Sequence, residues 1–310
     1  MSATRTDTTA PEAAEADAGG AEPIGDAADR RTGTGRNRRR WVRRIPLYAL
    51  LCAVAALFVG PFLLLLSTAL KPAHQAVNSS PPDLIPRPPV VDWFVEAWTT
   101  IPYPTFLVNS FIYIVVTIPI YLIVSALTAW PLARIQFRGR TVFFMLFLST
   151  MFLPSEVMLI PRFLVMSELQ LTDSYAAVIL PAILSSLGIF LMRQTFAQIP
   201  NEVIEAARVD GAGEFRIFAR IALPVAMPTI AVLTILGFIS VWNSFIWPMI
   251  VLNDQAKFPV ALGIAYLSGV SGNDVRGLAA GTVISLVPVI VAFILLQRHI
   301  LGSMSGAVKG

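Results

Sequence analysis

Charged residues are scarce in this chain of 310 residues, at 14%, whereas hydrophobic residues make up 55%. A soluble domain usually carries about 25% charged residues. The apolar residues come in long blocks and not at the spacing of amphipathic helices, so the bilayer is the solvent expected to bury them. The composition therefore excludes an ordinary soluble protein and predicts an all-α integral membrane protein.

Residues that carry catalysis and nucleotide binding are also few. The chain has one cysteine, Cys52, and two histidines, His74 and His299, and no HExxH motif. Neither a metal site nor a Cys/His nucleophile pair is therefore expected. The P-loop pattern GxxxxGK[ST] is absent as well, so any ATP would have to be bound by another chain. We expect no catalytic residue, and we assign Cys52 to packing inside a membrane span.

Six apolar blocks are long enough to cross a membrane. They cover about 45–70, 106–130, 141–166, 175–196, 225–252 and 278–296. Residues 1–40 offer almost nothing to bury and are predicted to form a disordered tail, which leaves 41–310 as the membrane domain. The third block contains Pro154 and Pro161, so a bend or break is expected in its outer half.

The distribution of positive charge predicts the topology. Eighteen of the 23 lysines and arginines fall on the side shared by both termini and by the 200–224 segment. The other side receives Lys71, Arg87, Arg162, Lys257 and Arg276. Because cytoplasmic loops carry the excess of positive charge, both termini are expected in the cytoplasm. The arginine cluster before the first block is explained in the same way, and nucleic-acid binding is not expected.

The segment PNEVIEAARVDGAGEFRIFARIALP, residues 200–224, is the one long polar stretch inside the apolar part of the chain. Asn201 is expected to cap a first short helix. Gly211 and Gly213 are expected to bracket a turn before a second helix, because glycine allows the backbone to reverse. Composition alone favours an ordinary amphipathic hairpin at the membrane surface.

The spacing of residues in this segment resembles the EAA loop of binding-protein-dependent ABC importer permeases. Further details resemble the carbohydrate-uptake (maltose-type) members of that family. There the loop is a coupling helix that docks into a cleft on a cytoplasmic ATPase subunit. The resemblance implies an ATPase-coupling role for Glu205, Ala206, Ala207, Asp210, Gly211, Ile221, Leu223 and Pro224.

The same resemblance implies a set of partners in a bacterial cell membrane. These are a second permease subunit, expected to be a paralogue, a dimeric cytoplasmic ATPase, an extracytoplasmic solute-binding protein and membrane lipid. ATP and Mg would be bound by the ATPase, with no cofactor in this chain. The carboxyl end resembles the permease tail that reaches the ATPase subunits, and it comprises Gly306, Ala307, Val308, Lys309 and Gly310.

A substrate path is predicted along the outer half of the fifth block, at Ser240, Trp242, Asn243 and Ser244. Aromatic faces stack on sugar rings, and amide and hydroxyl groups bond their hydroxyls. The alternative is an interfacial aromatic belt with Asn243 bonded to a neighbouring helix. Pro248 is expected to loosen the helix one turn later. Maltose-type permeases commonly have an acidic residue at the position of Ser244, so the substrate stays open.

Two other classes of function are weighed against an importer permease. A secondary transporter or channel subunit for a small polar solute would need mid-bilayer carboxylates or an internal repeat, and neither is found. A membrane-embedded enzyme would need a nucleophile and a base within reach, and no histidine lies in a predicted span. Glu156 and Arg162 could form a functional pair, but a structural role near the outer end of the third block is favoured.

Overall fold

The computed structural model describes residues 33–77, 79, 83–270 and 274–306. Within these ranges the regular secondary structure is helical and contains no β-strand, as the sequence predicts. The longer helices are α1 (Gly33–Ala69), α2 (Asp92–Thr100), α3 (Tyr103–Arg134), α4 (Arg140–Thr150), α5 (Leu159–Glu168), α6 (Tyr175–Ile183), α7 (Ser186–Ala197), α8 (Asn201–Val209), α11 (Met227–Trp242), α13 (Val260–Val270) and α14 (Val275–Gly306). Shorter helical pieces are α9 (Glu214–Ile217), the π-helix η1 (Phe218–Ala222), α10 (Leu223–Val225), α12 (Ile246–Val251) and the 3₁₀-helix η2 (Gln255–Lys257).

The chain forms two compact units, residues 1–59 and 60–310. The described part of the first unit belongs to α1, which begins at Gly33 and so includes part of the predicted tail. Arginine is a good helix former, which allows the basic stretch to extend the apolar helix. Residues 1–32 of that tail lie outside the described residues. Cys52 is exposed on α1, so the packing assigned to it is not made within the described part of this unit.

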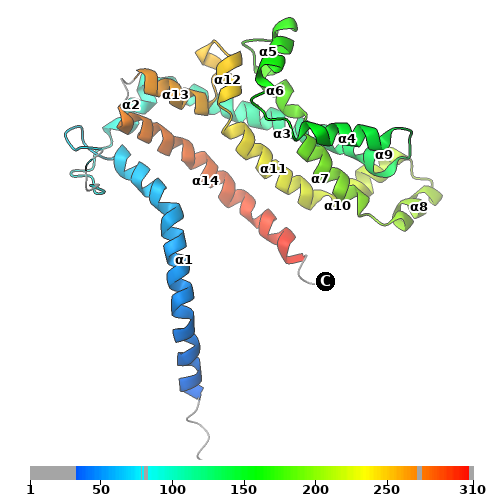
Figure 1. Cartoon of the computed structure of the whole chain (residues 1–310), viewed down its shortest axis with the longest axis horizontal. Coiled ribbons are helices and arrows are strands. Elements are labelled where there is room, and N and C mark those ends of the chain that lie inside the picture. Colours follow the sequence, from blue (N-terminus) through cyan, green and yellow to red (C-terminus); the bar gives the residue numbers. More distant parts are fainter. Residues whose placement is uncertain (1–32, 78, 80–82, 271–273, 307–310) are drawn as a thin grey trace, which may run out of the picture. The chain divides into compact units, whose positions relative to one another are not determined.

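α3 is the central helix of the second unit. It has buried side chains from Tyr103 to Ala133 and packs against α6, α7 and α11 (Figure 1). Side chains of α3 pack directly on the backbone of α7 at Gly188, where a Cβ atom would lie 2.5 Å from Oγ of Ser125. The buried side chains of this unit form two clusters, one at each end of α3.

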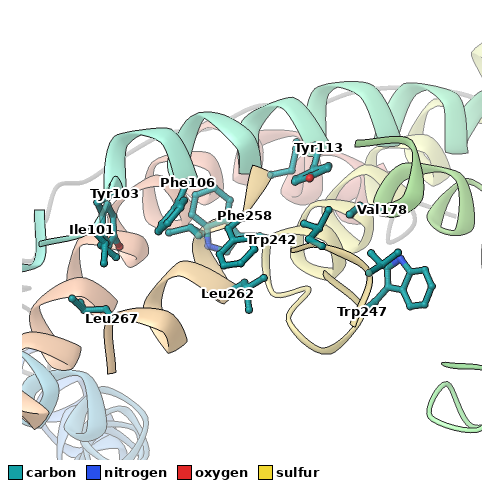
Figure 2. Close-up of a cluster of buried hydrophobic side chains, with 14 of the residues drawn as sticks. Ile101, Tyr103, Phe106, Tyr113, Val178, Trp242, Trp247, Phe258, Leu262 and Leu267 are labelled. Atoms are coloured by element: carbon teal, nitrogen blue, oxygen red, sulfur yellow. The ribbon is translucent and has the colours of Figure 1, made fainter. Parts of the chain in front are cut away.

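The amino-terminal cluster gathers aromatic residues from distant parts of the chain, including Tyr103, Phe106, Trp242 and Phe258 (Figure 2). The ring centroids of Phe106 and Phe258 lie 6.0 Å apart. Gly263 on α13 fits against the Phe106 ring, since a Cβ atom there would lie 2.1 Å from that ring. The apolar residues of α13 are therefore part of the core.

Polar side chains of α3 bind the segment that precedes α13. Nδ2 of Asn109 donates hydrogen bonds to the carbonyl oxygens of Ala256, at 2.8 Å, and Phe258, at 3.0 Å. Its Oδ1 accepts one from the Tyr175 hydroxyl at 2.7 Å. The Tyr113 hydroxyl donates to the carbonyl oxygen of Lys257 at 2.8 Å. Buried polar groups need such partners, so these bonds fix the segment's register on α3.

The carboxyl-terminal cluster is built around three aromatic rings. Trp130 of α3 meets Phe196 of α7 edge to face at 5.6 Å between centroids, and the Phe218 centroid lies 5.9 Å from that of Trp130. Phe196 and Phe218 are themselves 6.1 Å apart. Such pairs add to the stabilisation from buried area, so this end of α3 is a packed apolar block.

Four helical stretches in the described residues are long and apolar enough to cross a membrane, namely Pro46–Ala69, Tyr103–Arg134, Tyr175–Ala197 and Val275–Ile294. They correspond to the first, second, fourth and sixth predicted spans. A fifth stretch qualifies only if Glu214–Val225 and Met227–Trp242 are counted together, and this pair is bent by 72°.

The third and fifth predicted spans are not continuous helices, and the fourth is interrupted at residues 184–185, between α6 and α7. Turns at 151–158 separate α4 from α5, which confirms the break expected near Pro154, where the proline nitrogen cannot donate a hydrogen bond. The fifth span breaks between Trp242 and Ile246, earlier than predicted, since Pro248 occupies the first turn of α12, where proline is tolerated. The predicted outer loop 253–277 also contains an apolar helix, α13.

Candidate functional site

Residues 200–224 fold as two helical stretches around a turn, as the sequence predicts. The first is α8, and the second runs through α9, η1 and α10. The turn closes through two backbone hydrogen bonds: the amide of Gly211 donates to the carbonyl of Arg208, at 3.0 Å, and that of Ala212 to the carbonyl of Ala207, at 2.9 Å. These two bonds define a Schellman motif, whose glycine takes a left-handed conformation. Gly211 has φ +79°, as that motif requires.

Asn201 does not cap α8, contrary to prediction. Pro200 holds the capping position, and no side chain caps the helix there. Asn201 is instead the first residue of α8, and its Oδ1 accepts a hydrogen bond of 2.7 Å from Nη1 of Arg134. Arg134 also donates to the carbonyl oxygens of Phe196, at 2.8 Å, and Ile199. One arginine at the end of α3 thus satisfies carbonyls freed at the end of α7 and fixes the start of α8.

The segment is anchored by one apolar side chain from α8 and three from the second stretch. Ile204, Ile217, Phe218 and Ala222 are buried in the carboxyl-terminal cluster. Phe218 begins the π-helix, a wider turn that is often found at functional sites. Pro224 follows it and lacks the N–H that a regular α-helix would use.

The tip of the segment presents apolar side chains that no described part of the chain covers. Val209 is 87% exposed and Phe215 is 77% exposed. Glu205, Ala206 and Asp210 are exposed beside them. An ion pair at 2.8 Å joins Arg208 to Glu214 across the turn. Exposed apolar side chains rimmed by charge are typical of an interaction site.

The other predicted coupling residues lie closer to the body of the second unit. Ala207, Ile221 and Leu223 are partly buried against the carboxyl-terminal cluster, and Pro224 is exposed. A groove of about 450 Å³ runs beside the segment. Val203 and Ile221 line it together with residues of α7 and α11. The segment therefore combines a fixed base, an exposed tip and a lateral groove.

A separate cavity of about 350 Å³ lies among α3, α5, α6, α7, α11 and α12. Its polar lining comes from Thr117, Tyr121, Arg162, Ser185, Ser240 and Ser244. Its apolar walls include Val178, Leu236 and Trp247. The volume falls within the range of about 300–1,000 Å³ that is usual for small-molecule sites.

The four residues predicted for a substrate path separate into two pairs. Ser240 and Ser244 line the cavity. Trp242 is buried in the amino-terminal cluster, with its ring stacked 5.8 Å from that of Phe238. Asn243 is exposed and donates from Nδ2 to the carbonyl oxygen of Ile239 at 3.0 Å, within its own helix.

Residues 89–305 match the family described as binding-protein-dependent transport system inner membrane component. This match covers more than half of the chain. The chain belongs to this family. The predicted family is confirmed, and the chain is a membrane component of a transport system, not an enzyme in itself.

Individual inner membrane components of this family are clearly related to the chain. The arabinooligosaccharides transport system permease protein AraQ of Halalkalibacterium halodurans is 34% identical over 260 residues, or 83% of this chain and 93% of that protein. The sn-glycerol-3-phosphate transport system permease protein UgpE of Yersinia pestis bv. Antiqua is 33% identical over 230 residues, or 72% of this chain and 82% of that protein.

Solved structures share the fold of this inner membrane component. A crystal structure of a bacterial ABC transporter involved in the import of the acidic polysaccharide alginate aligns with a TM-score of 0.71 at 24% sequence identity. The alignment covers 89% of this chain and 99% of that chain. Membership in a binding-protein-dependent system decides against the two alternatives, a self-contained secondary transporter or channel and a membrane-embedded enzyme.

Sequence reasoning missed several residues that shape the site of this inner membrane component. Val209 and Phe215 are not among the predicted residues, although apolar residues at the tip of the most polar segment are themselves a signal of contact. The sequence pattern indicates only a topological role for Arg134. Arg162 does not pair with Glu156, which accepts a hydrogen bond from Ser155 at 2.9 Å. The predicted tail contact at 307–310 lies outside the described residues, which end at Gly306.

Proposed function

We propose that this chain is the permease subunit of an ATP-driven importer and that residues 200–224 couple it to a separate ATPase. The supporting observation is the exposed tip at Val209 and Phe215, held over a buried aromatic cluster in a chain of this family. A docking partner can push such a tip without deforming it, because its base is packed and its turn is closed by backbone hydrogen bonds.

The transported solute is a carbohydrate in this proposal. The relative from Halalkalibacterium halodurans is named for arabinooligosaccharides, and the solved transporter of similar fold imports alginate. The cavity beside α11 supports this assignment, since its hydroxyl groups suit the hydroxyls of a sugar. Ser240 and Ser244 line the substrate path and contact the sugar. Trp242 packs in the amino-terminal cluster and supports the path without lining it, and Asn243 lies where the helix α11 ends.

The remaining subunits follow from the same assignment. A second permease subunit, a paralogue of this chain, completes the path, and a dimeric cytoplasmic ATPase binds ATP and Mg. A solute-binding protein delivers the sugar from outside. The solved transporter has also been crystallised in complex with an alginate pentasaccharide-bound periplasmic protein. Six crossings result if α4–α5 and α11–α12 each form one broken span, with both termini cytoplasmic and the tail from Gly306 to Gly310 reaching the ATPase.

Substitution of Gly211 by valine tests the coupling role. Its φ of +79° lies in a region that β-branched residues rarely adopt, so Gly211→Val strains the turn although no atom lies within 4 Å of the added Cβ. The variant should keep its place in the assembled complex but lose ATPase stimulation by sugar-loaded binding protein. Gly213→Val is the matched control, since Gly213 has φ −71° and also has free space around it.

Stimulation would be measured in proteoliposomes that contain the complete complex. Loss in the Gly211 variant alone identifies the shape of the turn as the feature that couples. Loss in both variants indicates that the partner approaches both glycines closely. Full stimulation of the Gly211 variant would remove this segment from the coupling mechanism.

A further inference from the structure

Arg162 is the one charged residue among those that line the cavity of about 350 Å³. It belongs to α5, the second of the two helices into which the third predicted span is divided. An ionisable side chain held among apolar helices is costly and points to a function or to a specific partner. The argument below rests on the proposed function, because it concerns the solute that enters this cavity.

The guanidinium of Arg162 is positioned but not neutralised. Its Cζ lies 5.3 Å from the centre of the Trp247 ring, a cation–π arrangement. Trp247 is itself fixed, because its Nε1 donates to the carbonyl oxygen of Ala177 at 2.9 Å and its ring is buried. Within the described ranges, no carboxylate forms an ion pair with Arg162 and no acceptor takes a hydrogen bond from its side chain. A contact with the ring face forms no hydrogen bond, so the N–H donors of the guanidinium stay available for a solute.

Other residues of the lining supply groups that suit the rest of a sugar. Hydroxyls come from Ser240 and Ser244 on the α11 side, from Ser185 before α7, and from Thr117 and Tyr121 on α3. Each can donate to or accept from a solute hydroxyl. The cavity lining contains no aspartate or glutamate, so nothing in it repels a negative charge.

We propose that this cavity binds a carbohydrate that carries an anionic group, either a carboxylate or a phosphate ester, and that Arg162 is the residue that recognises this group. The planar guanidinium forms two parallel hydrogen bonds with such oxygens, which a neutral sugar cannot reproduce. Trp247 orients the guanidinium, and the hydroxyl-bearing residues hold the sugar ring.

Matched pairs of charged and neutral sugars test this assignment. The probes are galacturonate against galactose and glucose 1-phosphate against glucose. Binding would be measured by calorimetry on the complete transporter complex in phosphatidylcholine nanodiscs. At least one charged probe should bind about tenfold more tightly than its neutral partner, the difference expected when a charge-assisted, bidentate contact is made. Arg162→Gln should bring the two affinities of that pair together.

Two further variants separate recognition from general disruption. Arg162→Lys keeps the charge but not the fork of donors, so it should retain only part of the preference. Arg138→Gln removes an exposed arginine outside the cavity and should leave the preference unchanged. ATPase stimulation by loaded binding protein tests the proposed permease function separately. If stimulation is retained but charged probes are not preferred, this inference is wrong and the proposed permease function is not.

Several outcomes would overturn the proposal. Equal binding of charged and neutral probes, or no binding of either charged probe, would show that the cavity does not select an anion. Weaker binding of the charged probe when phosphatidylglycerol is added would assign the site to a lipid headgroup phosphate. Failure of Arg162→Gln to assemble, with normal assembly of Arg162→Lys, would assign Arg162 to a carboxylate of the second permease subunit.

Discussion

Both ends of α3 combine buried aromatic rings with hydrogen bonds to backbone carbonyls, but the two ends support different segments of the chain. At the carboxyl-terminal end, the rings of Trp130, Phe196 and Phe218 pack together beneath the 200–224 segment. At the other end, Asn109 and Tyr113 donate hydrogen bonds to backbone carbonyls of residues 256–258. Aromatic packing makes a block that moves as one body, whereas hydrogen bonds fix a particular register. The first suits a part that transmits force, and the second suits a part that holds a loop in place.

The largest effect is expected from the aromatic cluster. Phe196→Ala opens a cavity beneath the coupling segment and should lower the free energy of unfolding by about 3–5 kcal/mol, the range measured for buried aromatic truncations. Phe152→Ala makes the same chemical change at a side chain that is 85% exposed and should have little effect. Thermal unfolding of the purified complex would compare them. Equal melting temperatures would show that the cluster does not support this end of α3.

The two ends also differ in how far the sequence predicts them. The sequence identifies Gly211 because the EAA-like spacing and the need for a glycine in a tight turn both point to the same residue. Such a turn depends only on residues that are neighbours in the sequence. Phe196 and Phe218 meet only through tertiary packing between α7 and η1, and no local pattern joins them. α13 was not predicted because its eleven residues are too few for a span, and its burial depends on tertiary contacts with Phe106 and Phe258.

The break within the fifth span shows a further limit of local reasoning. Pro248 was the obvious disruptor, yet the helix ends at Trp242. The backbone amide of Asn243 still donates to the carbonyl of Ile239, and its side-chain Nδ2 donates to the same oxygen, so Asn243 is the last residue to make a regular helical bond. The helix therefore ends before the proline, at a position that no helix-breaking residue marks in the sequence.

An intermediate effect is expected at the polar end. Asn109→Leu removes two donated hydrogen bonds and one accepted bond, leaving carbonyl oxygens near α13 without partners. The free energy that holds residues 256–260 on α3 should fall by about 1–3 kcal/mol. Hydrogen exchange of those amides would report it. In the control variant Asn243→Leu, the lost bond lies within one exposed helix end, and exchange at 256–260 should not change. Unchanged exchange in both variants would show that these bonds do not fix the loop.

A smaller, pH-dependent effect is expected in the loop beside the polar end. Hydrogen bonds from the backbone amides of Asp254 and Asn253, followed by the ammonium of Lys257, lower the pKa of Asp173. A lowered pKa in the folded state gives stability that is present above the ordinary aspartate value of about 3.9 and is lost as pH falls through the folded value.

Hydrogen exchange of residues 253–257, measured between pH 7 and acid, would follow this loss. Asp254 contributes to the same titration, because the amide of Ala256 and then Lys257 lower its pKa. Asp173→Asn should therefore weaken the pH dependence without abolishing it. A pH profile identical to that of the parent would show that Asp173 does not stabilise the loop.

The smallest effect is expected from the ion pair at the tip of the coupling segment. Arg208 and Glu214 meet at 2.8 Å, but their side chains are 45% and 46% exposed, and such pairs contribute about 0–1 kcal/mol. The turn between them is already closed by the backbone bonds of Gly211 and Ala212, and the buried side chains of Ile204 and Phe218 hold its base. Arg208→Gln, Glu214→Gln and the double variant should therefore unfold within a few degrees of the parent at low salt and still closer to it at high salt.

ATPase stimulation distinguishes a role of these residues in stability from a role in contact with the ATPase. Loss in Arg208→Gln alone would indicate that this arginine contacts the ATPase. A large and equal loss of stability in both single variants would show that charge, and not the aromatic cluster, holds this end of the molecule, which would reverse the contrast between the two ends of α3.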